Sequence, residues 1–139
     1  MTGFLQRWLI ALLLLAVFSV VTQAADYMSP ALTPEQVLEK LDTSQALLVI
    51  DVRSPAKFGV AHIPGAINVP VAEIEGRLDE FRHDKGVLVY CINGTRTRKA
   101  EAILLGADVP NVYHLEGAFN AWIQGKHPVE KGGVKKSGW

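Results

Sequence analysis

The residue types best suited to chemistry lie between Tyr90 and Ala100, in the stretch YCINGTRTRKA, which holds the only cysteine of the chain. A cysteine thiolate is a strong nucleophile, and cationic surroundings lower its pKa below the ordinary value of about 8.5. Gly94 lets the backbone curl back tightly after Cys91. Arg96 and Arg98 supply positive charge that would favour a thiolate and hold an anionic substrate. This spacing indicates nucleophilic chemistry on a small anion.

The same stretch has a competing interpretation, because Asn93-Gly94 is a favoured two-residue turn of a β-hairpin. The return strand would then be 95–99, TRTRK, which has no large apolar side chain for a core face. As the start of a helix, the same residues form an exposed first turn, and Ala100, Ile103 and Leu104 follow at helical spacing. We therefore predict a strand, a short loop and a helix, with loop N–H groups converging on one concavity.

Helical and strand patterns alternate along the rest of the chain. Apolar runs suited to buried strands occupy 47–50 and 87–90, the turn HIPG leads into 66–69, and the last clear strand is predicted at 112–115. Between them, helices are predicted after the capping box at 33–36, from 54, around 74–81, from 95 to Gly106 and around 119–123. This order predicts a single α/β domain with a central, mainly parallel sheet and helices on both faces. Sites in such folds lie beyond the carboxyl ends of the strands, where Cys91 falls.

Residues 1–24 are expected to be a cleaved signal peptide, residues 25–129 the folded domain and residues 130–139 a flexible basic tail. The apolar run from Leu9 to Val21 is shorter than the roughly 18 to 20 residues that span a bilayer, and Ala24-Ala25 suits a cleavage site. An uncleaved anchor is the alternative. We expect an exported protein without stable membrane association after cleavage. With 14 basic and 14 acidic residues, we expect no nucleic-acid partner.

Four motifs in order resemble those of single-domain rhodaneses, a family of sulfurtransferases, and export makes the chain similar to periplasmic rhodaneses of the phage-shock-protein-E type. The resemblance covers nearly all of the mature chain. The motifs are Asp51-Val52-Arg53, the segment HIPGAINVP at 62–70, the loop CINGTRT at 91–97, and Leu115-Glu116-Gly117 followed by Trp122. The resemblance implies a rhodanese-like, three-layer domain. Two departures affect the backbone fit: Ala61 and Ala118 stand where the family favours glycine.

The resemblance also implies a site and a reaction. Cys91 would take a sulfane sulfur from thiosulfate as a persulfide and pass it to cyanide or a thiol, without a cofactor. The loop residues Ile92, Asn93, Gly94, Thr95, Arg96 and Thr97 would bind the substrate. Asp51 and Arg53 would support the site, more as a structural tie between strand ends than by touching the loop. His62 is interpreted as a turn anchor, and no metal-ligand spacing is present.

Three functional interpretations stay open. The first is a thiosulfate sulfurtransferase. The second is a persulfide carrier or partner-binding module without notable turnover. The third is a small-anion phosphatase or arsenate reductase, which is disfavoured because Cys91 to Arg96 is a six-residue loop. Related phosphatases have a loop one residue longer, which fits phosphate and its oxygens.

Overall fold

The computed structural model describes residues 28–43, 47–82 and 85–133. The predicted signal peptide and the last six residues lie outside these ranges. The described elements follow one another as β1 (Ala31–Leu32), α2 (Pro34–Asp42), β2 (Leu48–Asp51), α3 (Pro55–Val60), β3 (Ile67–Asn68), the 3₁₀ segment η2 (Val71–Phe81), β4 (Val87–Tyr90), α4 (Thr95–Gly106), β5 (Val112–Leu115) and α5 (Ala118–Gln124).

The strands form one five-stranded parallel sheet in the order β1-β5-β4-β2-β3. The register aligns Asp51 of β2 with Tyr90 of β4 and with Asn68 of β3. Because parallel strands end at the same edge, this register brings the Asp51 motif and the cysteine loop to one end of the sheet. All residues of β2 and β4 are buried, as their continuous apolar runs predict.

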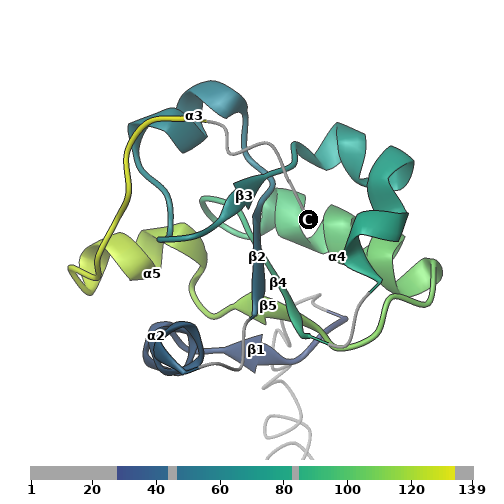
Figure 1. Ribbon diagram of the computed structural model, residues 1–139, viewed down its shortest axis with the longest axis horizontal. Coiled ribbons are helices and arrows are strands. Elements are labelled where there is room, and N and C mark those ends of the chain that lie inside the picture. The colour runs from purple at the N-terminus through teal and green to yellow at the C-terminus, as the bar shows by residue number, and fades with distance from the viewer. Residues whose placement is uncertain (1–27, 44–46, 83–84, 134–139) are drawn as a thin grey trace, which may run out of the picture.

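The sheet lies between two helical layers, so the predicted three-layer α/β architecture is confirmed (Figure 1). One core lies between the sheet, α4 and η2, and contains Val89, Cys91 and Leu104. The other core contains Tyr90 and Trp122, packed among the side chains of α2, α3 and α5. Alternate residues of β4 thus enter opposite cores, and Cys91 faces α4.

Local sequence signals explain most helix boundaries. Thr33 caps α2, its hydroxyl accepting the Gln36 N–H while the Gln36 side chain accepts the Thr33 N–H, so the predicted capping box is confirmed. Residues 71–81 differ from the expected helix because they form 3₁₀ turns with a kink at Arg77 (φ −128°). Gly76 precedes this kink, and the weak helix propensity of glycine accounts for a break at that point.

The segment after α5 returns to the HIPG turn, where the yellow part of the chain in Figure 1 runs from α5 to α3. Glu130 and His62 exchange two backbone hydrogen bonds of 2.9 Å, and the Gly132 N–H donates to the Gly59 carbonyl (2.8 Å). Glu130 was expected in a flexible tail, but these bonds place it on the folded domain, so the expected boundary at residue 129 is too early. Among the described residues, none of the helices has the length and apolar character of a membrane span.

Candidate functional site

The cysteine loop leaves β4 at Cys91 and becomes α4 at Thr95, as the strand–loop–helix prediction required. Gly94 immediately precedes the helix with φ 95° and ψ −16°, a left-handed conformation that favours glycine. This bend directs the Gly94 N–H at the Cys91 Sγ, 3.1 Å away. The Asn93 carboxamide oxygen accepts the Thr95 N–H (3.2 Å) and closes the loop. The loop therefore encircles the sulfur.

The Cys91 side chain is buried beneath this loop. Burial raises the pKa of the Cys91 thiol. The Thr97 hydroxyl and the N–H groups of Thr97, Asn93 and Gly94 together lower this pKa by more than burial raises it, so the net shift is downward. Arg96 and Arg98 are not among these causes, which differs from the expectation that arginine charge would lower the pKa. The thiolate is stabilised by directed hydrogen-bond donors.

The outer part of the loop is open to solvent. Ile92, Asn93, Thr95 and Arg96 are exposed, whereas Gly94 and Thr97 are buried. The first turn of α4 contains no acidic residue, so the positive charge of Arg96 adds to the positive dipole end of the helix. The predicted binding residues thus divide into a buried group, of which the Gly94 N–H contacts the sulfur, and an exposed group.

The start of α5 supports the loop from behind, a feature that the sequence interpretation missed. The Phe119 N–H donates to the Cys91 carbonyl (2.9 Å), and the Asn120 N–H donates to the Ile92 carbonyl (3.2 Å). These donors belong to the first turn of α5, where the N–H groups have no carbonyl acceptor within the helix itself. Gly117 and Ala118 make the preceding turn with φ of 68° and 56°. Ala118 is therefore held in a conformation that favours glycine, whereas Ala61 is extended (φ −166°) and fits without strain.

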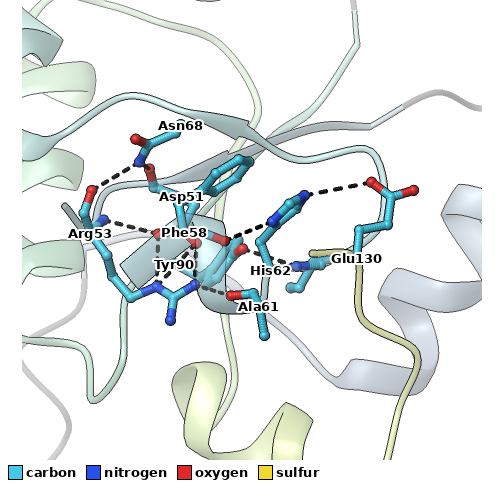
Figure 2. Close-up of polar contacts among 9 residues, drawn as sticks. Asp51, Arg53, Phe58, Ala61, His62, Asn68, Tyr90 and Glu130 are labelled. Carbon is cyan, nitrogen blue, oxygen red and sulfur yellow. Dashed lines mark hydrogen bonds and ion pairs between the residues drawn. The ribbon is translucent and has the colours of Figure 1, made fainter. Parts of the chain in front are cut away.

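Asp51 and Arg53 form a buried ion pair beside the loop (Figure 2). The Arg53 Nε lies 2.9 Å from Asp51 Oδ1, and its Nη2 donates to Asp51 Oδ2 (2.5 Å) and to the Ala61 carbonyl (2.7 Å). The guanidinium carbon also lies 4.2 Å from the ring centre of Phe119. Arg53 therefore joins the end of β2, the end of α3 and the start of α5, which favours the structural role predicted for this pair.

His62 is held at its turn by contacts away from the cysteine (Figure 2). Its Nδ1 lies 2.9 Å from the Phe58 carbonyl oxygen, its ring stacks on Phe58, and its Nε2 lies 3.5 Å from Glu130 Oε2. The adjacent Ile63 N–H donates to the Tyr90 hydroxyl (3.1 Å), and burial raises the pKa of that phenol. These contacts agree with a turn-anchoring role for His62.

This combination of a parallel sheet and a cysteine loop defines a known class of domain. Residues 33–124 match the family described as the rhodanese-like domain, and the chain belongs to that family. The resemblance stated from the motifs is therefore confirmed.

Individual relatives agree with this assignment. The thiosulfate sulfurtransferase GlpE of Glaesserella parasuis is 30% identical over 101 residues, covering 73% of this chain and 93% of that protein. The uncharacterised protein YqhL of Bacillus subtilis is 39% identical over 74 residues, covering 53% of this chain and 59% of that protein. Among solved structures, the thiosulfate sulfurtransferase of Pseudomonas aeruginosa matches with a TM-score of 0.72 and 31% identity, covering 80% of this chain and 22% of that one.

Proposed function

We propose that the protein is a sulfurtransferase that moves a sulfane sulfur from thiosulfate to cyanide or a thiol through a persulfide on Cys91. The observation that carries the proposal is the hydrogen bond from the Gly94 N–H to the Cys91 sulfur, within a loop that lowers the thiol pKa. The similarity to thiosulfate sulfurtransferases such as GlpE supports the same reaction class. A single buried nucleophile with fixed donors suits covalent transfer in two steps.

In the first step, the Cys91 thiolate attacks the outer sulfur of thiosulfate. A new S–S bond forms, the bond between the two sulfur atoms of thiosulfate breaks, and sulfite leaves with the electron pair. The product persulfide carries one negative charge, which the N–H groups of Asn93, Gly94 and Thr97 stabilise as they do the thiolate. Arg96 binds the sulfonate oxygens of the donor at the entrance.

In the second step, cyanide or an acceptor thiolate attacks the outer sulfur of the persulfide. The S–S bond breaks, thiocyanate or a new persulfide is released, and the Cys91 thiolate is regenerated. The six-residue loop favours this chemistry, since its small cradle suits one sulfur atom better than a tetrahedral oxyanion. The reaction needs no added oxidant, reductant or cofactor.

The test is thiocyanate formation from thiosulfate and cyanide by residues 25–139, alongside the Cys91→Ser variant. We expect turnover by the parent protein and none by the variant, with both folded. Full activity of the folded variant would overturn the mechanism. Mass spectrometry after thiosulfate treatment separates turnover from carriage: a persulfide adduct of about 32 Da that no acceptor discharges would support the carrier alternative instead.

We also propose that residues 1–24 direct export and that the protein acts in the periplasm. The short apolar run and Ala24-Ala25 support this proposal. Expression of the full chain, followed by fractionation and measurement of the mature N-terminus, tests it. Retention of the full N-terminus in the membrane fraction would support an uncleaved anchor and overturn the proposed cleavage.

A further inference from the structure

Three polar side chains are buried together on the sheet face that carries Cys91, and the proposed reaction does not use them. Glu101 lies on α4, His114 on β5, and Ser29 just before β1. The Ser29 hydroxyl donates to Glu101 Oε1, and His114 Nδ1 lies 3.2 Å from both Glu101 Oε1 and Ser29 Oγ. All three side chains are more than nine-tenths buried, and Glu101 is completely so. A fully buried carboxylate is unusual and calls for a physical reason.

The cluster is close to the nucleophile in the fold. His114 is paired in register with Val89, and Cys91 lies two residues after Val89 on the same face of the sheet. Glu101 lies on the buried face of α4, as does Thr97 four residues earlier. Thr97 is the residue whose hydroxyl lowers the pKa of Cys91. Glu101 is therefore one helical turn from the side chain whose hydroxyl lowers the thiol pKa.

Two oxygens on this face are buried without a hydrogen-bond partner among the described residues: Glu101 Oε2 and Thr97 Oγ1. Residues four apart on a helix have Cβ atoms about 5 to 6 Å from each other, a gap that these side chains can bridge directly or through one water. A hydroxyl has one hydrogen to donate. Thr97 can give that hydrogen to the Cys91 sulfur or to the Glu101 carboxylate, but not to both.

We propose that Glu101 is a positioning residue for the nucleophile: its unpartnered carboxylate oxygen competes with the Cys91 sulfur for the Thr97 hydroxyl hydrogen and so favours the protonated thiol at rest. In the resting state, the S–H group donates to Thr97 Oγ1, and the hydroxyl donates to Glu101. When the thiol ionises, the Thr97 hydroxyl turns to the sulfur and Glu101 loses its donor.

Ser29 and His114 fix the competing carboxylate in place. Both engage Oε1, which leaves Oε2 as the oxygen available to Thr97. The other side chains that α4 and β5 bury in this core, Ala100, Leu104 and Val112, are apolar. The polar groups bonded to Glu101 are the imidazole of His114 on β5 and the hydroxyl of Ser29 before β1, and the hydroxyl of Thr97 lies one turn away on α4.

This inference rests on Cys91 being the nucleophile of the proposed reaction, but its test does not require sulfur transfer. Because the chain has one cysteine, the rate of alkylation by iodoacetamide across pH reports the pKa of Cys91 alone. We expect Glu101→Gln to lower that pKa and to raise the alkylation rate below it about three- to tenfold, since one pKa unit is a tenfold change in thiolate. Glu75→Gln, at an exposed acid of η2, is the matched control and should leave the rate unchanged.

The dependence on Thr97 separates the proposed competition from simple charge repulsion. In a Thr97→Val background, Glu101→Gln should change the alkylation rate much less than it does in the parent protein. An effect of equal size in both backgrounds, or an unchanged or slower rate in Glu101→Gln itself, would overturn the proposal. A purely structural role for Glu101 would not produce this dependence.

If Glu101→Gln does not fold, a crystal structure of the reduced parent protein at a pH below the thiol pKa provides the second test. We expect Thr97 Oγ1 and Glu101 Oε2 to be joined by a hydrogen bond or by one bridging water. Engagement of Oε2 by another group would contradict the proposal. Absence of thiocyanate formation by the parent protein would instead contradict the proposed function. That result would not affect the alkylation rates or the crystal structure.

Discussion

Gly117→Ala tests whether the turn before α5 holds the cysteine loop in place. Gly117 has φ 68°, and a Cβ added there would lie 2.5 Å from the Cβ of Ala121. The left-handed conformation disfavours alanine by roughly 1 to 2 kcal/mol, and crowding of this kind typically adds about 1 to 3 kcal/mol. Reduced freedom of the unfolded chain offsets about 0.4 to 1 kcal/mol. We expect a net loss of about 1 to 5 kcal/mol in the free energy of unfolding.

The assay is urea unfolding of residues 25–139, followed by circular dichroism and by tryptophan fluorescence. This fluorescence comes from Trp122, which is fully buried on α5, and from Trp139. Gly106→Ala is the matched control, because a Cβ added to this last residue of α4 meets nothing within 4 Å. It should be neutral or stabilise by up to about 1 kcal/mol. Equal unfolding free energies for Gly117→Ala and the parent protein would refute the reasoning about this turn.

Four further changes probe the site and its support. Thr97→Val should raise the thiol pKa of Cys91 by about 1 to 2, because a hydrogen bond to a charged group contributes about 1.5 to 3 kcal/mol; an unchanged alkylation profile would contradict this. Arg96→Ala should raise the KM for thiosulfate about tenfold or more, whereas Lys57→Ala on α3 should leave it unchanged. Equal effects of the two variants on KM would contradict the proposed binding of thiosulfate by Arg96. Arg53→Met should destabilise the fold by about 3 to 5 kcal/mol, since Asp51 stays buried without its cation; unchanged urea unfolding would contradict the structural role. The pKa of Cys91 is lower in the folded than in the unfolded chain. The ionised thiol should therefore add to the free energy of unfolding in full above the ordinary thiol pKa of about 8.5, and this added stability should be lost as pH falls through the folded pKa. Urea unfolding of the parent protein and of Cys91→Ser at several pH values measures this added stability. A difference in unfolding free energy between the two proteins that shrinks with rising pH would contradict the prediction.

Features set by local patterns could be predicted from the sequence. The capping box at Thr33 and the missing core face of residues 95–99 each depend on neighbours in the chain, and both predictions are confirmed. The motif Asp51-Val52-Arg53 could be placed at a strand end because it follows the apolar run 47–50 and resembles a family motif found there, and β2 does end at Asp51. The two-residue strand β1 was not predicted, because Ala31-Leu32 has no periodicity and gains its identity from pairing with β5.

Long-range contacts account for what the sequence could not provide. The bonds from Phe119 and Asn120 to the loop carbonyls involve backbone groups, which no side-chain pattern reveals. The contact between Glu101 and His114 joins a helix to a strand whose register was unknown before the fold. The source of the lowered thiol pKa was only partly predicted: N–H groups of the loop and the helix start lower it as expected, whereas the expected arginine charge is not among the causes.

The sheet order has a consequence for how the chain is completed during synthesis. The only described partner of β1 is β5, and the HIPG turn is bonded to Glu130, so both early segments depend on residues made near the end. In a ribosome-bound chain that lacks the residues beyond about 111, β1 has no strand to pair with and the HIPG turn lacks its hydrogen bonds to Glu130. Such a nascent chain stays open along one sheet edge until the last fifth emerges. Premature termination there would release a molecule with an exposed strand edge, the kind of surface that recruits chaperones or aggregates.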